Sequence, residues 1–203
     1  MVVGTIGSFL AIILANQNQQ TDQSRINELT AQYQKDYNEY QAKVDAQATQ
    51  LSAQYFETFN QFATRPAAFD AAGVTELQTS DIIVGDGAAI TKESSFTAYY
   101  IGWNPTGKVF DGSIEGDALK APFDVTPGGV IPGWTQGADG MKVGGVRELT
   151  IPASLAYGET GSGADIPANT PIKFIIMIIP TPEKIDAPAM PPELIKYYQA
   201  GGQ

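Results

Sequence analysis

The side chains best suited to chemistry gather between Lys108 and Ile179, where single polar groups interrupt a series of aromatic and aliphatic segments. Asp111 and the hydroxyl of Tyr157 are among these polar groups. Ligand pockets are commonly built in this way, with hydrophobic walls and a few polar groups that orient the ligand. The pattern therefore predicts a site that binds and polarises one small apolar moiety.

Composition limits the chemistry of that site. The chain has 203 residues and contains neither Cys nor His. It therefore has no disulfide framework, no Ser-His or Cys-His nucleophile and no histidine base. We expect no cofactor and no metal ion. A net charge of −10, with arginine only at Arg25, Arg65 and Arg147, also argues against a nucleic-acid partner.

The segments FDGS, VIPGW, AYGETG and IPANTPIKF follow one another at intervals that resemble the FKBP family of peptidyl-prolyl cis-trans isomerases, or rotamases. The match covers roughly Leu77 to Ile179, about half of the chain. The resemblance implies an α+β fold in which an antiparallel β-sheet wraps around a short helix. We place this FKBP-type domain at residues 77–180.

The same resemblance implies roles for individual residues. Trp134 forms the floor under the proline ring, while the Ile131 N–H and the Tyr157 hydroxyl donate to carbonyls of the bound peptide. Asp111 either orients Tyr100 or interacts with the twisted amide. The catalytic set is Asp111, Tyr157, Trp134, Tyr100 and Ile131, and the substrate-binding set is Phe110, Phe123, Val125, Val130, Ile166 and Phe174.

Some positions depart from the common family pattern. Val125 occupies a place where a second aromatic residue is frequent, which should widen that wall. Ser162 and Asp165 occupy places in the loop after Tyr157 where histidine, aromatic or aliphatic residues are frequent. The implied partners are therefore proline-containing peptides or unfolded protein clients, with a macrolide bound only weakly.

The N-terminal segment is apolar and uncharged. We predict that residues 1–15 form a membrane anchor or signal segment and that residues 16–23 form a polar linker. The apolar run is shorter than the ~20 residues of a spanning helix and lacks a basic start, so we expect that a longer anchor or signal preceded it. The alternative is a buried core helix. Because residues 1–24 carry no Lys or Arg, the isomerase domain is predicted to be extracytoplasmic, either membrane-anchored or exported.

Residues 24–64 predict one long helix that serves as a stalk or for dimerisation, with capping candidates at and just after Ser24. Its apolar positions repeat every 11 residues, a period that keeps them on one face of a nearly straight helix. Such a stripe needs a partner. A homodimer, in the manner of a coiled coil through residues 24–62, is the first interpretation. Packing on the isomerase domain and a solvated stalk are the alternatives.

The remaining chain predicts a linker, a sheet and a tail. Residues 65–76 form the linker, and residues 181–203 form a Pro-rich tail with little order apart from a short turn at Pro192 to Tyr198. A short helix from Ile131 to Met141 carries Trp134. The expected strands are Leu77–Val84, Phe96–Trp103, Val146–Pro152 and Ile172–Ile179.

Three functions follow from these features. The first is a peptidyl-prolyl isomerase, a folding chaperone that assists exported or extracytoplasmic proteins through an apolar, desolvating proline pocket. The second is a non-catalytic FKBP-like module on a membrane-tethered stalk that binds a peptide or protein. The third is a structural role for the helix and anchor. The joint presence of Asp111, Trp134 and Tyr157 favours the first.

Overall fold

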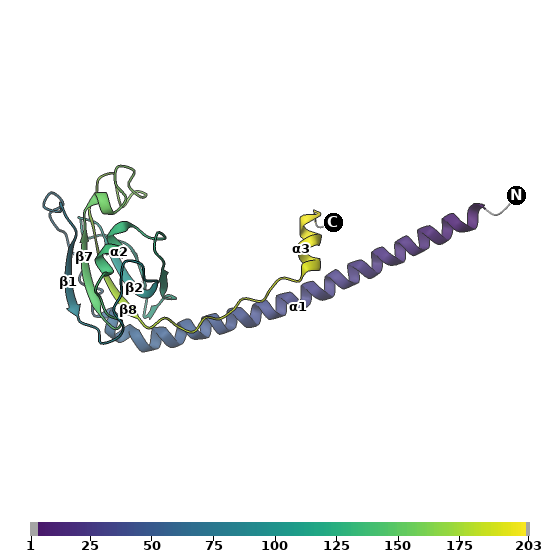
Figure 1. The fold of residues 1–203 in the computed structure, drawn as a ribbon, viewed down its shortest axis with the longest axis horizontal. Coiled ribbons are helices and arrows are strands. Elements are labelled where there is room, and N and C mark those ends of the chain that lie inside the picture. Colours follow the sequence, from purple (N-terminus) through teal and green to yellow (C-terminus); the bar gives the residue numbers. More distant parts are fainter. Residues whose placement is uncertain (1–3, 202–203) are drawn as a thin grey trace. The chain divides into compact units, whose positions relative to one another are not determined.

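A computed structural model describes residues 4–201 of the chain, with side chains from residue 22 onward. The chain divides into two compact units. One unit consists of residues 45–183, and the other consists of the described residues before 45 and after 183. Figure 1 labels the three α-helices and strands β1, β2, β7 and β8.

The first element is α1, a helix over Gly4–Asn60 (Figure 1). It includes residues 16–23, so the predicted polar linker and the predicted helix start at Ser24 are both corrected. The NQNQQTDQ segment contains neither Gly nor Pro, and Gln is a good helix former, so nothing there ends the helix. Of the predicted anchor, residues 1–3 lie outside the described residues. Throughout the described part of the chain, no helix combines the length and apolarity that crossing a membrane requires.

The 45–183 unit is organised around a six-stranded antiparallel sheet. The spatial order is β1-β7-β8-β2-β3, and β6 also pairs with β2. A separate hairpin joins β4 and β5. The strands are β1 (Gln78–Ile83), β2 (Phe96–Trp103), β3 (Val109–Gly112), β4 (Ile114–Glu115), β5 (Ala118–Leu119), β6 (Phe123–Val125), β7 (Val146–Ile151) and β8 (Ile172–Ile179).

The α+β fold predicted from the sequence is confirmed, with an antiparallel sheet around a short helix and a long helix before it. The four predicted strands correspond to β1, β2, β7 and β8. Strands β3 to β6 escaped the sequence analysis because each is too short to show an alternating pattern. A one-turn 3-10 helix, Ala153–Leu155, follows β7.

The central strands supply side chains to two separate cores, because successive residues of a strand point to opposite faces. On one face, Phe96 and Ala98 of β2 join Ile176 and Ile178 of β8. Helix α2 (Pro132–Ala138) covers this face and is shorter than the predicted Ile131–Met141. This first core includes the buried Trp134.

The opposite face of the sheet packs against the end of α1. Phe59 is fully buried there, and its ring centroid lies 6.1 Å from that of Tyr99 on β2. The Leu119 N–H donates to Ser52 Oγ at 2.8 Å. From the helix side this second core contains Leu51, Tyr55, Phe56, Phe59 and Phe62, and from the sheet side it contains Tyr99, Ile101, Trp103, Val146, Ile175, Met177 and Ile179.

The second core changes two interpretations of the sequence. A domain boundary at residue 77 omits the part of α1 that completes this core. The last part of the 11-residue stripe also packs on the sheet that follows it, which was the alternative to a partner helix. Self-association through the earlier part of the stripe stays a prediction.

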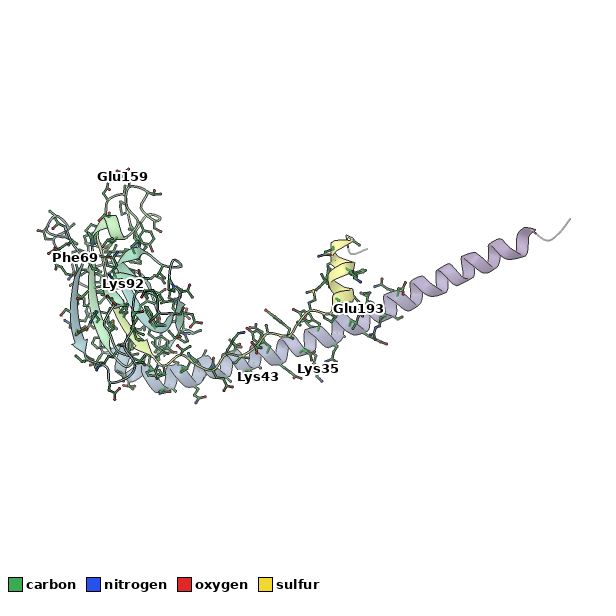
Figure 2. The ribbon with its side chains drawn as sticks, in the orientation of Figure 1. Lys35, Lys43, Phe69, Lys92, Glu159 and Glu193 are labelled. Atoms are coloured by element: carbon green, nitrogen blue, oxygen red, sulfur yellow. The ribbon has the colours of Figure 1, made fainter. Side chains whose placement is uncertain are left out.

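The predicted linker, residues 65–76, also lies against the 45–183 unit. The Phe69 N–H donates to the Pro105 carbonyl at 3.0 Å. Lys173 Nζ lies 5.3 Å from the centroid of the Phe69 ring, which is labelled in Figure 2. These contacts fix the segment between α1 and β1.

The tail after residue 183 contains α3 (Pro192–Gln199), where only a short turn was predicted. Pro192 occupies the first helical position, where its fixed φ favours a helix, and Glu193 lies in the first turn. Leu194 is buried. These local signals extend the turn into a short helix.

Helix α2 lies close to β7 because two glycines face the strand. A Cβ at Gly133 would lie 2.3 Å from the side chain of Ile151. A Cβ at Gly137 would lie 2.7 Å from the side chain of Leu149. Any larger residue would push α2, and Trp134 with it, away from the sheet.

Arg147 of β7 fixes the end of α2. Its Nη1 donates to the carbonyls of Gly137 and Asp139 at 2.8 and 3.0 Å. Its Nε and Nη2 donate to the two carboxylate oxygens of Asp81 on β1 at 2.6 and 3.1 Å. The guanidinium therefore connects β1, β7 and α2, the helix that carries Trp134.

We expect acid to weaken this connection. The hydrogen bond from Arg147 holds the pKa of Asp81 below its usual value of 3.8. A carboxyl group with a lowered folded-state pKa stabilises the fold above its unfolded pKa, and this contribution disappears as the pH falls through the folded pKa. Asp81→Asn should therefore lower the free energy of unfolding at about pH 7 and make less difference below about pH 4. Urea unfolding at both pH values measures this, and an equal difference at both would contradict it.

Candidate active site

A cavity of about 710 Å³ opens on the α2 side of the sheet. Its size suits a small apolar group of a ligand or peptide. Its walls come from β2, β3, β6, β8, the start of α2 and the loop after Tyr157. The lining residues are Tyr100, Phe110, Asp111, Phe123, Gly128, Gly129, Val130, Ile131, Trp134, Tyr157, Ser162, Gly163, Ala164, Asp165, Ile166 and Phe174.

Trp134 lies at the bottom of this cavity with only 4% of its surface exposed. Three aromatic rings meet it edge to face: Tyr100 at 5.3 Å, Phe123 at 6.0 Å and Phe174 at 5.2 Å between ring centroids. Such tilted contacts are the favoured geometry of aromatic pairs. The indole is thus held rigidly by rings from three strands.

Two neighbouring residues of β3, Phe110 and Asp111, both line the cavity. Neighbours in a regular strand would point to opposite faces. Here the pairing of β2 with β3 shifts register between Gly102 and Trp103, where Gly102 faces Asp111 and Trp103 faces Val109. Phe110 is the extra residue of this bulge, and bulges redirect side chains in this way.

Gly102 of β2 makes room for the wall. It pairs with Phe174 of β8, and the Phe110 and Phe174 rings meet edge to face at 5.5 Å. A Cβ at Gly102 would lie 2.4 Å from Phe174 Cε1 and 2.8 Å from Phe110 Cε2. The missing side chain therefore lets both rings close over the strand.

Asp111 and Tyr100 form one polar unit on the cavity wall. The Tyr100 hydroxyl donates to Asp111 Oδ2 at 2.6 Å, and the Gly112 N–H donates to Oδ1 at 2.8 Å. Burial, then the hydrogen bond to Asp111, raises the pKa of Tyr100 well above its usual 10.0. The phenol therefore stays neutral and keeps donating to the carboxylate at any physiological pH.

Two further residues that carry donor groups, Ile131 and Tyr157, line the cavity. Burial is the main cause that raises the pKa of Tyr157, and the negative charge of Asp111 adds to it. The Tyr157 hydroxyl therefore also remains protonated. Within the described residues, neither the Tyr157 hydroxyl nor the Ile131 N–H donates a hydrogen bond to another protein group. Both are therefore available to carbonyl groups of a bound chain.

Comparison with known proteins agrees with this geometry. The family profile described as FKBP-type peptidyl-prolyl cis-trans isomerase matches residues 87–179. A probable FK506-binding protein of Corynebacterium glutamicum is 42% identical over 106 residues, which cover 51% of this chain and 86% of that protein. This chain belongs to the FKBP-type isomerase family.

Other relatives differ in how much of their own length this chain covers. FK506-binding protein 4 of Rhizopus delemar is 42% identical over 99 residues, and this chain spans only 25% of its length. A solved peptidyl-prolyl cis-trans isomerase from Pseudomonas syringae pv. tomato is 27% identical with a TM-score of 0.46, over 66% of this chain and 96% of that one. The matched family segment begins at residue 87, so α1 lies outside it.

Among the residues predicted for the FKBP site, Val125 alone does not line the cavity. It is 1% exposed and belongs to the first core. Phe123, two positions earlier on β6, occupies the cavity rim and is 40% exposed. Val125 therefore supports the wall from beneath, and the expected widening there is corrected.

The sequence analysis left out several lining residues that carry little or no side chain. Gly128 and Gly129 precede α2, while Gly163 and Ala164 lie in the loop after Tyr157. Gly128 and Gly163 have positive φ values of 79° and 62°, so tight turns bring the backbone to the cavity. The paired glycines before VIPGW and the GSG of the loop were the available signals.

The Tyr100 and Asp111 unit can be tested by a double-mutant cycle. If Asp111 acts by orienting Tyr100, Tyr100→Phe and Asp111→Ala should each lower kcat/KM by a similar factor, and the double variant should lose little more. A charge-assisted hydrogen bond is worth about 1.5 to 3 kcal/mol, so the coupling should be easy to resolve. Additive losses would instead assign Asp111 a direct interaction with the substrate.

Proposed function

We propose that this FKBP-type chain catalyses cis-trans isomerisation of X-Pro bonds in protein clients by removing water from the twisting amide. The observation that carries the proposal is the floor made by Trp134, which is buried beneath the rings of Tyr100, Phe123 and Phe174. A proline ring is small, apolar and flat enough to pack on an indole.

The reaction needs no nucleophile or base. Rotation about a peptide bond breaks no bond, and its barrier of ~18 to 20 kcal/mol comes from lost amide resonance. The planar amide is polar and well hydrated, whereas the twisted amide separates less charge. An apolar cavity therefore stabilises the twisted state relative to the planar one, and each ~1.4 kcal/mol of preference gives a tenfold rate increase.

The polar groups at the edge of the cavity would hold the substrate backbone. The Ile131 N–H and the Tyr157 hydroxyl would donate to carbonyls on either side of the proline. Asp111 already accepts from Tyr100 and from the Gly112 N–H, which supports the orienting role for its carboxylate. The Tyr100 ring is thereby kept in place while the amide rotates.

The clients and the location belong to the same proposal. The absence of Lys and Arg from residues 1–24 supports an extracytoplasmic domain that acts on exported, unfolded chains. The apolar stripe before residue 45 supports a homodimer, and Ser162 and Asp165 on the cavity wall support weak macrolide binding. Cell fractionation, sedimentation of the full chain and macrolide titration would each test one of these statements.

The isomerase activity can be tested with two matched tryptophan variants. The chain contains two tryptophans, Trp134 in the cavity and Trp103 in the second core. Wild type should accelerate exchange of an X-Pro tetrapeptide, with an apolar residue before proline preferred. Trp134→Phe should lower kcat/KM by about three- to tenfold, because the floor shrinks, whereas Trp103→Phe should retain the wild-type value.

The control also supplies a binding measurement. In Trp103→Phe the remaining indole is Trp134, so its fluorescence reports a peptide that enters the cavity. Wild-type exchange at the rate of buffer alone, together with saturable quenching in Trp103→Phe, would replace the isomerase with the non-catalytic binding module.

A further inference from the structure

The loop after Tyr157 forms one wall of the cavity and is closed by its own backbone. The Gly161 N–H donates to the Tyr157 carbonyl at 3.1 Å, and the Ser162 N–H donates to the Ile166 carbonyl at 2.7 Å. Residues 162–166 all line the cavity. In Figure 2, Glu159 marks the far end of this loop. The position of the wall depends on what holds the loop from outside.

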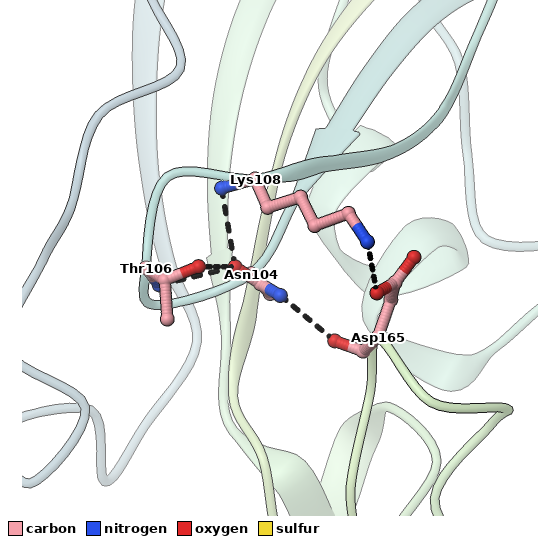
Figure 3. Close-up of polar contacts among 4 residues, drawn as sticks. All are labelled: Asn104, Thr106, Lys108 and Asp165. Atoms are coloured by element: carbon pink, nitrogen blue, oxygen red, sulfur yellow. Dashed lines mark hydrogen bonds and ion pairs between the residues drawn. The ribbon is translucent and has the colours of Figure 1, made fainter.

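Two side chains from the turn before β3 hold it at a single residue (Figure 3). Asn104 Nδ2 donates to the Asp165 carbonyl at 2.9 Å, and Lys108 Nζ donates to Asp165 Oδ1 at 2.6 Å. The same turn leads directly into Phe110 and Asp111, which also line the cavity. It therefore links the loop to β3 within the cavity lining.

Both ends of the Asn104 amide are hydrogen-bonded. Its Oδ1 accepts from the Thr106 N–H at 3.0 Å, the Thr106 hydroxyl at 2.7 Å and the Lys108 N–H at 3.2 Å (Figure 3). These three donors fix the orientation of the amide, so that Nδ2 must point to Asp165. Asn104 is 8% exposed, which makes it a buried hub between turn and loop.

The two contacts to Asp165 differ in strength. The ion pair is open to solvent, with 61% of the Lys108 side chain and 38% of the Asp165 side chain exposed, and exposed ion pairs contribute little. The Asn104 contact joins a buried donor to a backbone carbonyl, and loss of such a donor leaves the acceptor unpaired. The amide therefore holds the loop more firmly than the charge does.

We propose that Asn104 is a positioning residue of the isomerase site, which fixes the wall formed by residues 162–166 against the cavity. This inference rests on the proposed isomerase function. Asn104 does not line the cavity, so it acts through Asp165. Since the Trp134 floor and the Tyr100–Asp111 pair lie elsewhere, the wall governs how well a peptide binds rather than how fast its amide rotates.

Asn104→Asp in the full chain is the decisive variant. The carboxylate keeps the acceptor for Thr106 and Lys108 but has no hydrogen to donate to the Asp165 carbonyl. We expect KM for a proline tetrapeptide to rise about three- to tenfold with kcat within about twofold. Hydrogen exchange of the Ser162 N–H should accelerate, while exchange of the Ile176 N–H on β8 stays unchanged.

Lys108→Met is the matched control, because it keeps the aliphatic stem and removes the exposed charge. Its KM should stay within about twofold of wild type at physiological salt. Asn104→Gly, which removes the amide altogether, is the second variant and should raise KM in the same way. It keeps the test decisive if Asn104→Asp does not fold.

Three results would overturn the inference. The first is a wild-type KM in a folded Asn104 variant, and the second is faster exchange of Ser162 and Ile176 alike, which would indicate a purely structural role. The third is an effect of Lys108→Met as large as that of Asn104→Asp. If wild type itself proves inactive, the proposed function fails, and peptide affinity from Trp134 fluorescence in Trp103→Phe then decides whether Asn104 positions the wall.

Discussion

The alternation of side chains along β2 and β8 creates two apolar faces, and both must be covered for the sheet to be stable. Helix α2 covers one face and supplies Trp134 to the cavity. The end of α1 covers the other face, where Phe59 is fully buried against Tyr99. One sheet thus separates a core used for binding from a core used for stability.

Among the described residues, the second core contains two buried polar groups that lack hydrogen-bond partners. These groups are the Tyr99 hydroxyl and the Trp103 Nε1. Burial is the main cause that raises the pKa of Tyr99 to about 12, and the electrostatic effect of nearby Tyr55 adds to it. The hydroxyl therefore remains neutral. Each unpaired group costs free energy that the apolar contacts of α1 must exceed. The helix end is therefore part of the domain rather than an appended stalk.

The sequence was sufficient for the parts of the fold that show long, regular patterns, such as strands β1, β2, β7 and β8. It was also sufficient for most of the site, because Trp134 and its neighbours belong to segments with family-like spacing. It was not sufficient where tertiary contacts decide. The bulge that turns Phe110 and Asp111 to one side has no local pattern, and the Asn104 contact to Asp165 joins residues that are 61 positions apart. The stripe on α1 predicted a partner but could not identify the sheet as that partner.

The most direct test of this account is urea unfolding of Phe59→Ala in the full chain, with isomerase activity measured at each urea concentration. Removal of a fully buried phenylalanine should cost about 3 to 5 kcal/mol of the free energy of unfolding. Activity per folded molecule should stay at the wild-type value, because the cavity lies on the other face. Activity and the structural signal should then disappear in one transition at lower urea. An unchanged unfolding midpoint would contradict the claim that the end of α1 completes the domain.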